Sequence, residues 1–241
     1  MPLIEEITMN ELADGLRKSS TVILPCGSVE EHGPHLPLGT DTWHAMEIAR
    51  RTAQKRFVWV APPLWYGLCR STSQHPGTIG ISGLTLRTII CDIVRSLYKQ
   101  GFRNVIILSG HAGSTHSAML IDACEELVNE LDKLKCAVLT VLDLGARAWK
   151  GIVETTDDSH AGEVETSVIL HMRPETVKGT AQKEWPDFPP FMIVRDKRKY
   201  WPGGVWGDPQ KASPEKGKKL LEASVAEMIK IIDAMEKETD D

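Results

Sequence analysis

Three short segments of the sequence collect the side chains that most often bind metal ions or move protons. They are EEHGPHLPLGTDTWH at 30–44, SGHAGSTH at 109–116 and DSHAGEVETS at 158–167. In the first segment Glu30 and His32 are two residues apart, so in an extended chain they project to the same side. A turn rich in Gly and Pro then returns the chain to Asp41. Glu, His and Asp bind borderline divalent cations such as zinc, manganese or iron, so this segment predicts a metal site.

A pair of metal ions would explain why the three segments carry these residue types. A carboxylate can bridge two cations about 3.5–4 Å apart, and a water between them loses a proton near neutral pH. Asp41 is the candidate bridge. A histidine that does not bind metal can polarise the scissile carbonyl or protonate the leaving group, and His160 is the candidate for this role. His111 follows an apolar run and stands between glycines, which allow close approach of the backbone.

Each of these residues has a simpler interpretation when it is taken alone, because a single Glu or His is more often a solvated surface residue or a helix cap. Asp158 and Ser159 could be N-caps of the following helix, and Glu165 could be a capping partner or an acceptor behind a metal ligand. The segment 109–116 could bind an anion at a helix N-terminus, although it lacks the Gly-Lys-Ser/Thr of a P-loop. No Gly-x-Ser-x-Gly elbow is present, which disfavours a serine hydrolase.

The elements that must position these residues alternate between strand and helix patterns. Short apolar runs predict strands at 21–27, 57–63, 104–110 and 136–144. Amphipathic patterns predict helices at 41–56, 84–101, 114–135, 162–172 and 213–238. Residues 174–209 are rich in Pro and Trp, which predicts a long irregular segment. We therefore expect one α/β domain over residues 1–241, a three-layer α/β/α arrangement with a mostly parallel central sheet. Such sheets bind ligands at the carboxyl ends of their strands.

Composition argues against several other classes of protein. The chain has 241 residues, of which 25% are charged, and a net charge of −5, so the basic surface of a nucleic-acid-binding protein is not expected. Its five cysteines show no CxxC spacing, which favours reduced thiols over a disulfide framework or a zinc ribbon. The N-terminal residues carry acids where a signal peptide has a basic and then an apolar run. No apolar stretch approaches ~18 residues, so we expect a cytoplasmic protein without membrane spans.

Five segments taken together resemble the creatininase (creatinine amidohydrolase) family. They are GSVEEHGPHLPLGTD, the HPGT that follows PPLWYG, SGHAGSTH, HAGEVETS and GGVWGDPQKASPEKG. The resemblance implies an α/β fold, two metal ions, and hydrolysis of a C–N bond in an amide, cyclic amide or formamide by a metal-bridging hydroxide. It also implies a homohexamer built as a trimer of dimers.

The resemblance implies roles for particular residues. Glu30 and His32 match the Glu-x-His ligands, one for each metal, and Asp41 matches the bridging aspartate. His111 matches the Gly-His ligand, and Glu163 matches the glutamate of His-Ala-Gly-Glu, a ligand in most of the family. The expected cofactors are therefore two divalent cations, zinc in the first place, with manganese or iron as alternatives.

The remaining site residues concern catalysis and the substrate, which is expected to be a small molecule. His160 matches the family histidine that polarises the carbonyl or transfers protons. The segment around HPGT resembles the substrate loop, so Ser71, Ser73 and His75 are the candidate substrate-binding residues. Creatininase proper has a ligand glutamate where this chain has Gly113, and its substrate-covering tryptophans have no counterparts in register here. The substrates expected besides creatinine are a formamidopyrimidine nucleotide, a cofactor-precursor peptide and a keto-cyclitol.

A non-enzymatic protein is the competing hypothesis. The same residues could hold one closed structural metal, or bind a small ligand as a sensor. The candidate ligands are rich in carboxylates and no cysteine is expected among them, whereas structural zinc sites favour thiolates. Removal of a structural metal would unfold the chain.

Overall fold

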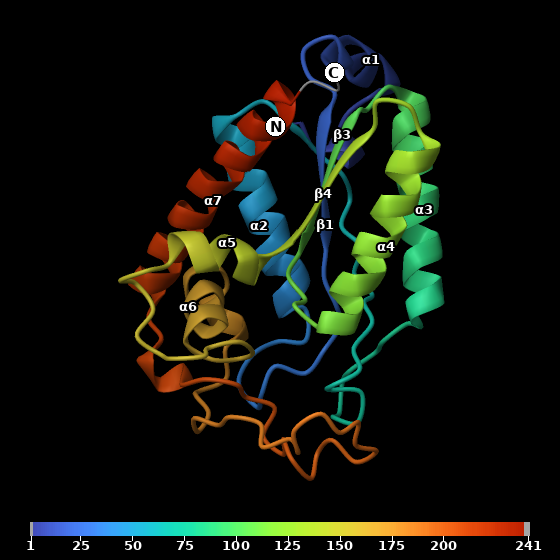
Figure 1. Cartoon of the computed structure of the whole chain (residues 1–241). Helices are drawn as coiled ribbons and strands as arrows, with labels where there is room; N and C mark the ends of the chain where they lie inside the picture. The colour runs from blue at the N-terminus through green and yellow to red at the C-terminus, as the bar shows by residue number, and fades with distance from the viewer. Residues whose placement is uncertain (1, 239–241) are drawn as a thin grey trace.

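Four parallel strands lie side by side at the centre of the molecule (Figure 1). The computed structural model describes residues 2–238. The strands are β1 (Thr21–Cys26), β2 (Trp59–Val60), β3 (Asn104–Ser109) and β4 (Lys135–Thr140), in the spatial order β2-β1-β3-β4. Every pairing is parallel, as the apolar runs predict. All residues of β1 and β3 are buried, because helices cover both faces of the sheet.

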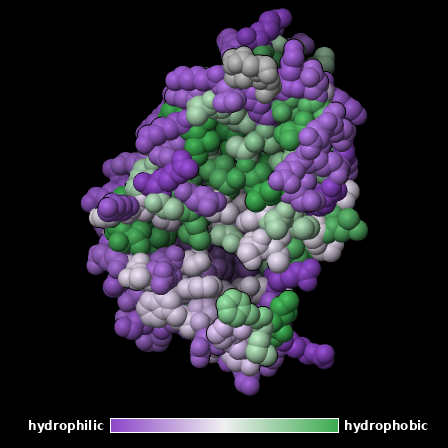
Figure 2. All heavy atoms as spheres, in the orientation of Figure 1, coloured by the Kyte–Doolittle hydropathy of each residue, from purple (hydrophilic) through white to green (hydrophobic). Residues whose placement is uncertain are grey.

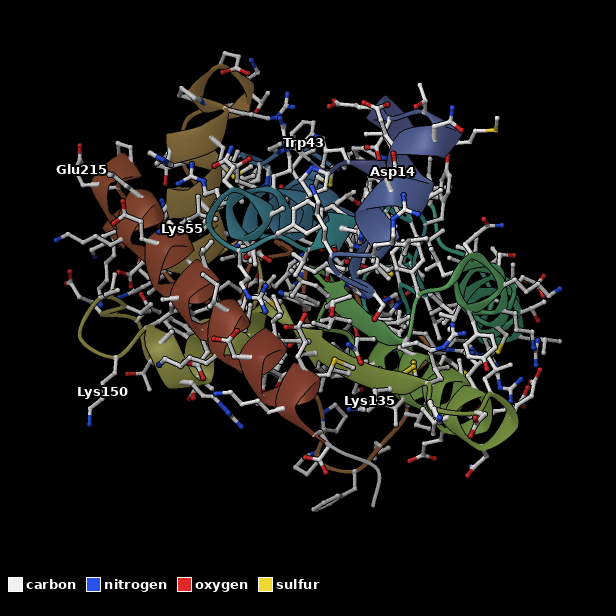
Figure 3. The ribbon with its side chains drawn as sticks, turned by 90° about the horizontal axis from the view of Figure 1, so that it is seen from above. Asp14, Trp43, Lys55, Lys135, Lys150 and Glu215 are labelled. Carbon is white, nitrogen blue, oxygen red and sulfur yellow. The ribbon has the colours of Figure 1, made fainter. Side chains whose placement is uncertain are left out.

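Helices form a layer on each face of the sheet, so the predicted three-layer α/β arrangement is confirmed. One layer holds α2 (Thr40–Lys55), α5 (Val141–Ala148), α6 (Glu163–Met172) and α7 (Pro214–Lys237), and the other holds α3 (Gly83–Gln100) and α4 (Ser114–Glu130). Figure 3, seen from above, shows α7 on one side of the sheet and α3 and α4 on the other. The short helix α1 (Met9–Leu16) packs on the second layer. Successive residues of β1 point to opposite faces, so Ile23 enters the α2–α7 core and Leu24 the α3–α4 core.

Two helix ends follow capping patterns that are readable in the sequence. Ser213 caps the start of α7, and Gly101 ends α3 in the left-handed conformation with φ of 110°, as predicted. The predicted strand 136–144 is too long, because β4 ends at Thr140. The side chains of Thr140 and Asp143 form a capping box, which satisfies two N–H groups at a helix start. This local bonding makes the second half of the apolar run a helix, α5.

Two other predicted elements are shorter in the structure. The run 57–63 contributes only the two residues of β2. The predicted helix 114–135 ends at Glu130, because the chain must turn before β4 begins. No helix within residues 2–238 is long and apolar enough to span a membrane.

The carboxyl ends of three strands lie level with one another. Cys26 pairs with Ser109, and Ser109 pairs with Thr140. Residues 174–209 cross this end of the sheet (Figure 1) and are irregular except for the short 3₁₀ helices Pro174–Thr176 and Pro209–Lys211. Figure 2 shows the surface hollowed between this segment and the body of the molecule, with hydrophilic residues at the floor of the hollow. The edge of the sheet where ligands are expected is therefore also where the surface is hollowed.

Candidate metal centre

The loop after β1 carries Glu30 and His32, and the first turn of α2 carries Asp41. All three side chains are buried, with exposed fractions of 1%, 0% and 2%. Gly110 follows β3 directly and lets this strand end approach α2, since a Cβ there would lie 2.0 Å from the carbonyl oxygen of Asp41. Any larger residue would push the next side chain, His111, away from Asp41. The sheet edge thus brings the first two predicted segments together.

Asp41 lies between the two histidines of these segments. Its Oδ1 is 3.0 Å from His32 Nε2, and its Oδ2 is 3.4 Å from His111 Nδ1. Glu30 Oε2 lies 2.7 Å from the same nitrogen of His111. The Ser28 hydroxyl donates to Asp41 Oδ2 at 2.6 Å and to Glu30 Oε2 at 3.2 Å, which fixes the two carboxylates relative to each other. Asp41 therefore has the position of a bridging carboxylate, with one oxygen for each histidine.

Backbone carbonyl groups determine which nitrogen of each histidine carries its proton. His32 Nδ1 donates to the carbonyl oxygen of Glu30 at 3.0 Å, and His111 Nε2 donates to that of Leu68 at 3.2 Å. In a neutral imidazole the other nitrogen is then an acceptor. Both acceptor nitrogens face carboxylate oxygens, which are acceptors as well. Either an imidazolium proton or a metal ion must lie between such groups, and a backbone contact on the far nitrogen is the arrangement by which proteins orient metal-binding histidines. The residues present therefore fit a metal.

The electrostatics of the cluster also favour a cation. Burial alone would lower the pKa of His32, but the carboxylates of Asp41 and Glu165 outweigh it and hold the pKa well above its usual value. Burial alone would raise the pKa of the Glu30 carboxyl, but the imidazole of His111 that faces it lowers this pKa to about 2. The carboxylates stay ionised at neutral pH, and positive charge placed between them is stabilised.

The third predicted segment forms the first turn of α6, and its two glutamates point in different directions. Glu163 does not reach the cluster: its Oε1 accepts from Lys216 Nζ at 2.5 Å, and its Oε2 accepts from the backbone N–H of Thr155 at 2.7 Å. Glu165 Oε2 instead lies 3.6 Å from His32 Nε2. The structure therefore brings Glu165 to the position that the resemblance implies for Glu163.

His160 lies at the border of the cluster, against His32. Their ring centroids are 4.2 Å apart, and His160 Nε2 donates to the carbonyl oxygen of Glu31 at 2.8 Å. Backbone hydrogen bonds in both directions tie His160 to Trp206, and the ring of Trp201 packs edge-on at 5.2 Å. Burial lowers the pKa of His160, as does His32, but the hydrogen bond with Glu31 and nearby carboxylates outweigh these effects and raise it.

The predicted substrate loop divides into exposed and buried residues. Ser71 and Ser73 are exposed, and Ser73 donates to the carbonyl oxygen of Arg70 at 3.1 Å. His75 is buried, with its Nε2 donating to the carbonyl oxygen of Trp201 at 2.9 Å. Between them, the buried hydroxyl of Thr72 donates to Glu30. Sequence reasoning missed Thr72, because a threonine in a polar loop carries no signal of its own.

A thiol also lies beside the cluster. The donor atoms of Cys69, Glu30 and His111 all lie within 4.8 Å of one another, as do those of His32, His160 and Glu165. The expectation that no cysteine accompanies the candidate ligands is therefore wrong. Cys69 follows β2 along the chain and shows no ligand spacing in the sequence, so only the fold reveals it.

Comparison with known proteins gives the same family as the motifs. The family model described as "Creatininase: Creatinine amidohydrolase" matches residues 5–232. The mycofactocin precursor peptide peptidase of Mycobacterium ulcerans is 30% identical, over 87% of this chain and 81% of the relative. The creatinine amidohydrolase of Pseudomonas putida is 26% identical over 92% of each chain. The 3-dehydro-scyllo-inosose hydrolase of Thermotoga maritima is 28% identical, over 75% of this chain and 58% of the relative.

Solved structures match over nearly the whole chain. A crystal structure of creatinine amidohydrolase superposes with a TM-score of 0.86 at 24% identity, covering 99% of both chains. A manganese form of creatininase gives 0.85 at 25% identity, over 97% of this chain and 98% of the other. A zinc form of a creatininase mutant gives 0.84 at 24% identity, over 96% and 97%. The fold is thus shared along the entire length of these proteins.

Proposed function

Because the chain belongs to the creatininase family, we propose that it uses two divalent cations to hydrolyse a C–N bond of an amide, cyclic amide or formamide. Glu30, His111 and Asp41 would hold one cation, and His32, Glu165 and Asp41 the other. Zinc is the first candidate and manganese or iron the alternatives, since Glu, His and Asp bind all three. The bound cations would lower the pKa of a water shared between them and polarise the substrate carbonyl.

The surrounding residues orient the ligands. The carbonyl oxygens of Glu30 and Leu68 hold the two imidazoles in one tautomer, and the hydroxyls of Ser28 and Thr72 hold the carboxylates in place. Such supporting hydrogen bonds reduce the reorganisation needed when a cation or substrate binds.

His160 would transfer the proton to the leaving nitrogen. Its Nε2 is committed to the carbonyl oxygen of Glu31, so Nδ1 is the atom that would exchange a proton with the substrate. The hydrogen bond with Glu31 and the nearby carboxylates raise the pKa of His160 in the metal-free protein, and a protonated imidazole is the form that a general acid requires. The rings of His32 and Trp201 restrain its orientation.

The substrate is proposed to be a small molecule or the end of a short peptide. The relatives include hydrolases named for creatinine, for a precursor peptide and for a keto-cyclitol. This chain has Gly113 where the resemblance to creatininase proper implies a glutamate, and Glu165 supplies the carboxylate in its place. We therefore favour a substrate other than creatinine, bound by the loop that contains Ser71, Ser73 and His75. A panel of amides with ammonia, amine and formate readouts tests this choice.

The observation that carries the proposal is the convergence of two histidine nitrogens on three carboxylates in a buried site. Elemental analysis of the freshly purified protein tests it. We expect about two equivalents of zinc, manganese or iron per chain, and loss of activity but retention of the fold after chelation. One equivalent whose removal unfolds the chain would instead indicate a structural metal.

Two further proposals concern the whole protein. We propose that residues 1–241 form one metallohydrolase domain, and that the protein is a cytoplasmic homohexamer, as the family resemblance implies. Light scattering of the purified protein measures the oligomer directly.

A further inference from the structure

The half of the centre that contains Glu30 and His111 has a thiol at its side. Cys69 is buried, with an exposed fraction of 4%. Its sulfur, a Glu30 oxygen and a His111 nitrogen lie within 4.8 Å of one another, which is a separation that a single cation can close. The other half, with His32 and Glu165, has only nitrogen and oxygen donors within the same distance. The two halves therefore differ in the chemistry of their donors.

The backbone next to Cys69 is fixed to the rest of the cluster. The carbonyl oxygen of Leu68 accepts from His111, and its N–H donates to His116 Nδ1 at 3.1 Å. The carbonyl oxygen of Gly67 accepts from the N–H of Ile81 at 2.9 Å. Leu68 thus sets the tautomer of His111 and, as the residue before Cys69, also sets the position of the Cys69 backbone. The thiol therefore stays close to His111.

Neighbouring groups show what the thiol is suited for. The Cys69 thiol donates to the carbonyl oxygen of Gly67 at 3.8 Å, a weak hydrogen bond that a metal ion can replace. A dication held by Glu30 and His111 would stabilise the thiolate beside it. Metal binding at such a site releases the thiol proton to solvent.

We propose that Cys69 Sγ is a ligand of the cation held by Glu30 and His111, and that it makes this half of the centre a softer site than the half with His32 and Glu165. The inference rests on the proposed metal centre and refines it. Thiolates favour zinc, cobalt and cadmium, whereas carboxylates and imidazole also suit manganese. The protein would then bind two different cations in a preferred order, the softer one on the side of Cys69.

Cobalt(II) is the probe for the experiment, because a thiolate bound to it gives a charge-transfer band in the near ultraviolet that nitrogen and oxygen ligands do not give. The metal-free full-length chain is titrated with cobalt chloride under reducing conditions. We expect the band to appear in the wild-type protein and to saturate at one of the two bound equivalents. Cys69→Ser should lose the band and still bind cobalt. Cys136→Ser is the matched control, because Cys136 lies at the amino half of β4, and it should keep the band.

The other possible results separate a failure of the Cys69 ligand from a failure of the whole metal centre. Two equivalents of cobalt without the band in the wild-type protein would overturn the role of Cys69 and leave the metal centre standing. A band that persists in Cys69→Ser would place the thiolate elsewhere and overturn it too. No bound cobalt at all would overturn the metal centre together with this inference. If Cys69→Ser does not fold, Cys69→Ala takes its place, and the same loss of the band is expected.

Discussion

Two buried glutamates lie two residues apart in the first turn of α6, and they face different parts of the molecule. Glu163 meets the ammonium group of Lys216, from α7. Glu165 meets His32 at the cluster, and among residues 2–238 the structure gives it no lysine or arginine as a partner. Both carboxylates are buried, with exposed fractions of 0% and 5%, so the two glutamates differ mainly in the side chain that each one faces. A lysine ammonium neutralises a buried carboxylate at neutral pH, whereas an imidazolium that faces one can give up its proton and leave the carboxylate to a metal ion.

Helix geometry explains why only one of the two can reach the cluster. At 3.6 residues per turn, positions two apart lie about 200° from each other around the axis. Glu163 shares a face with Ser167, whose hydroxyl accepts from the N–H of Ser213 at the start of α7. Glu165 shares a face with Ile169, which packs with Leu36 from the loop after β1. The packing of α6 between α7 and this loop therefore fixes the role of each glutamate.

The largest effect is expected from Glu165→Ala. Removal of this carboxylate should cost one of the two cations and reduce kcat/KM by more than about 100-fold, because a lost ligand costs more than a lost supporting hydrogen bond. Elemental analysis and a rate measurement with the best substrate of the panel check both effects. Glu163→Ala is the matched control and should retain both cations. The opposite pattern would return the ligand role to Glu163.

The next effect concerns the histidine that borders the cluster. His160→Asn should retain both cations and lower kcat by about 10²–10⁴-fold, which is the usual contribution of a general acid or base. The profile of kcat against pH should lose one limb in the variant. His171→Asn serves as the control, because His171 lies at the other end of α6 and should leave both readouts unchanged. Loss of a cation from His160→Asn would show that His160 is a ligand.

A smaller effect is expected in the proposed substrate loop, where two neighbouring hydroxyls donate to different partners. Thr72 donates to Glu30, whereas Ser73 donates only to the backbone of Arg70. Thr72→Val should therefore weaken cation affinity by about 10–100-fold, as the loss of a supporting hydrogen bond does. Ser73→Ala should leave the affinity unchanged and affect only KM. Competition with a fluorescent chelator measures the affinity, and equal effects of both variants would contradict the distinction.

Much of this arrangement can be predicted from the sequence. The strands predicted at 21–27 and 104–110 and the candidate ligands Glu30 and Asp41 follow from apolar runs that end in polar turns. The choice between Glu163 and Glu165 does not follow, because it depends on which side of α6 packs against α7. Proximity of Cys69 to Glu30 also depends on the path of the chain after β2, which no local pattern encodes. Local chemistry thus predicts the types of ligand, and tertiary packing selects among them.

The smallest effect concerns stability and isolates the structural role of Glu163. Burial opposes its charge, but Lys216 and the N–H of Thr155 outweigh burial and lower its pKa. Glu163→Gln should lower the free energy of unfolding by about 1.5 kcal/mol at neutral pH, the magnitude of one charged hydrogen bond. Urea unfolding of both proteins measures the difference.

The pH dependence of that difference separates charge from packing. The folded pKa of Glu163 lies below its unfolded value of about 4.3, so its contribution is complete above that pH and is lost as the pH falls through the folded pKa. The difference between wild type and Glu163→Gln should therefore narrow in acid, since other carboxylates titrate alike in both proteins and cancel. A difference that stays constant down to about pH 3 would mean that Glu163 stabilises the fold by packing alone. In that case the ion pair with Lys216 would not stabilise the charged form of Glu163, and it would not explain why Glu163 and Glu165 differ in their roles.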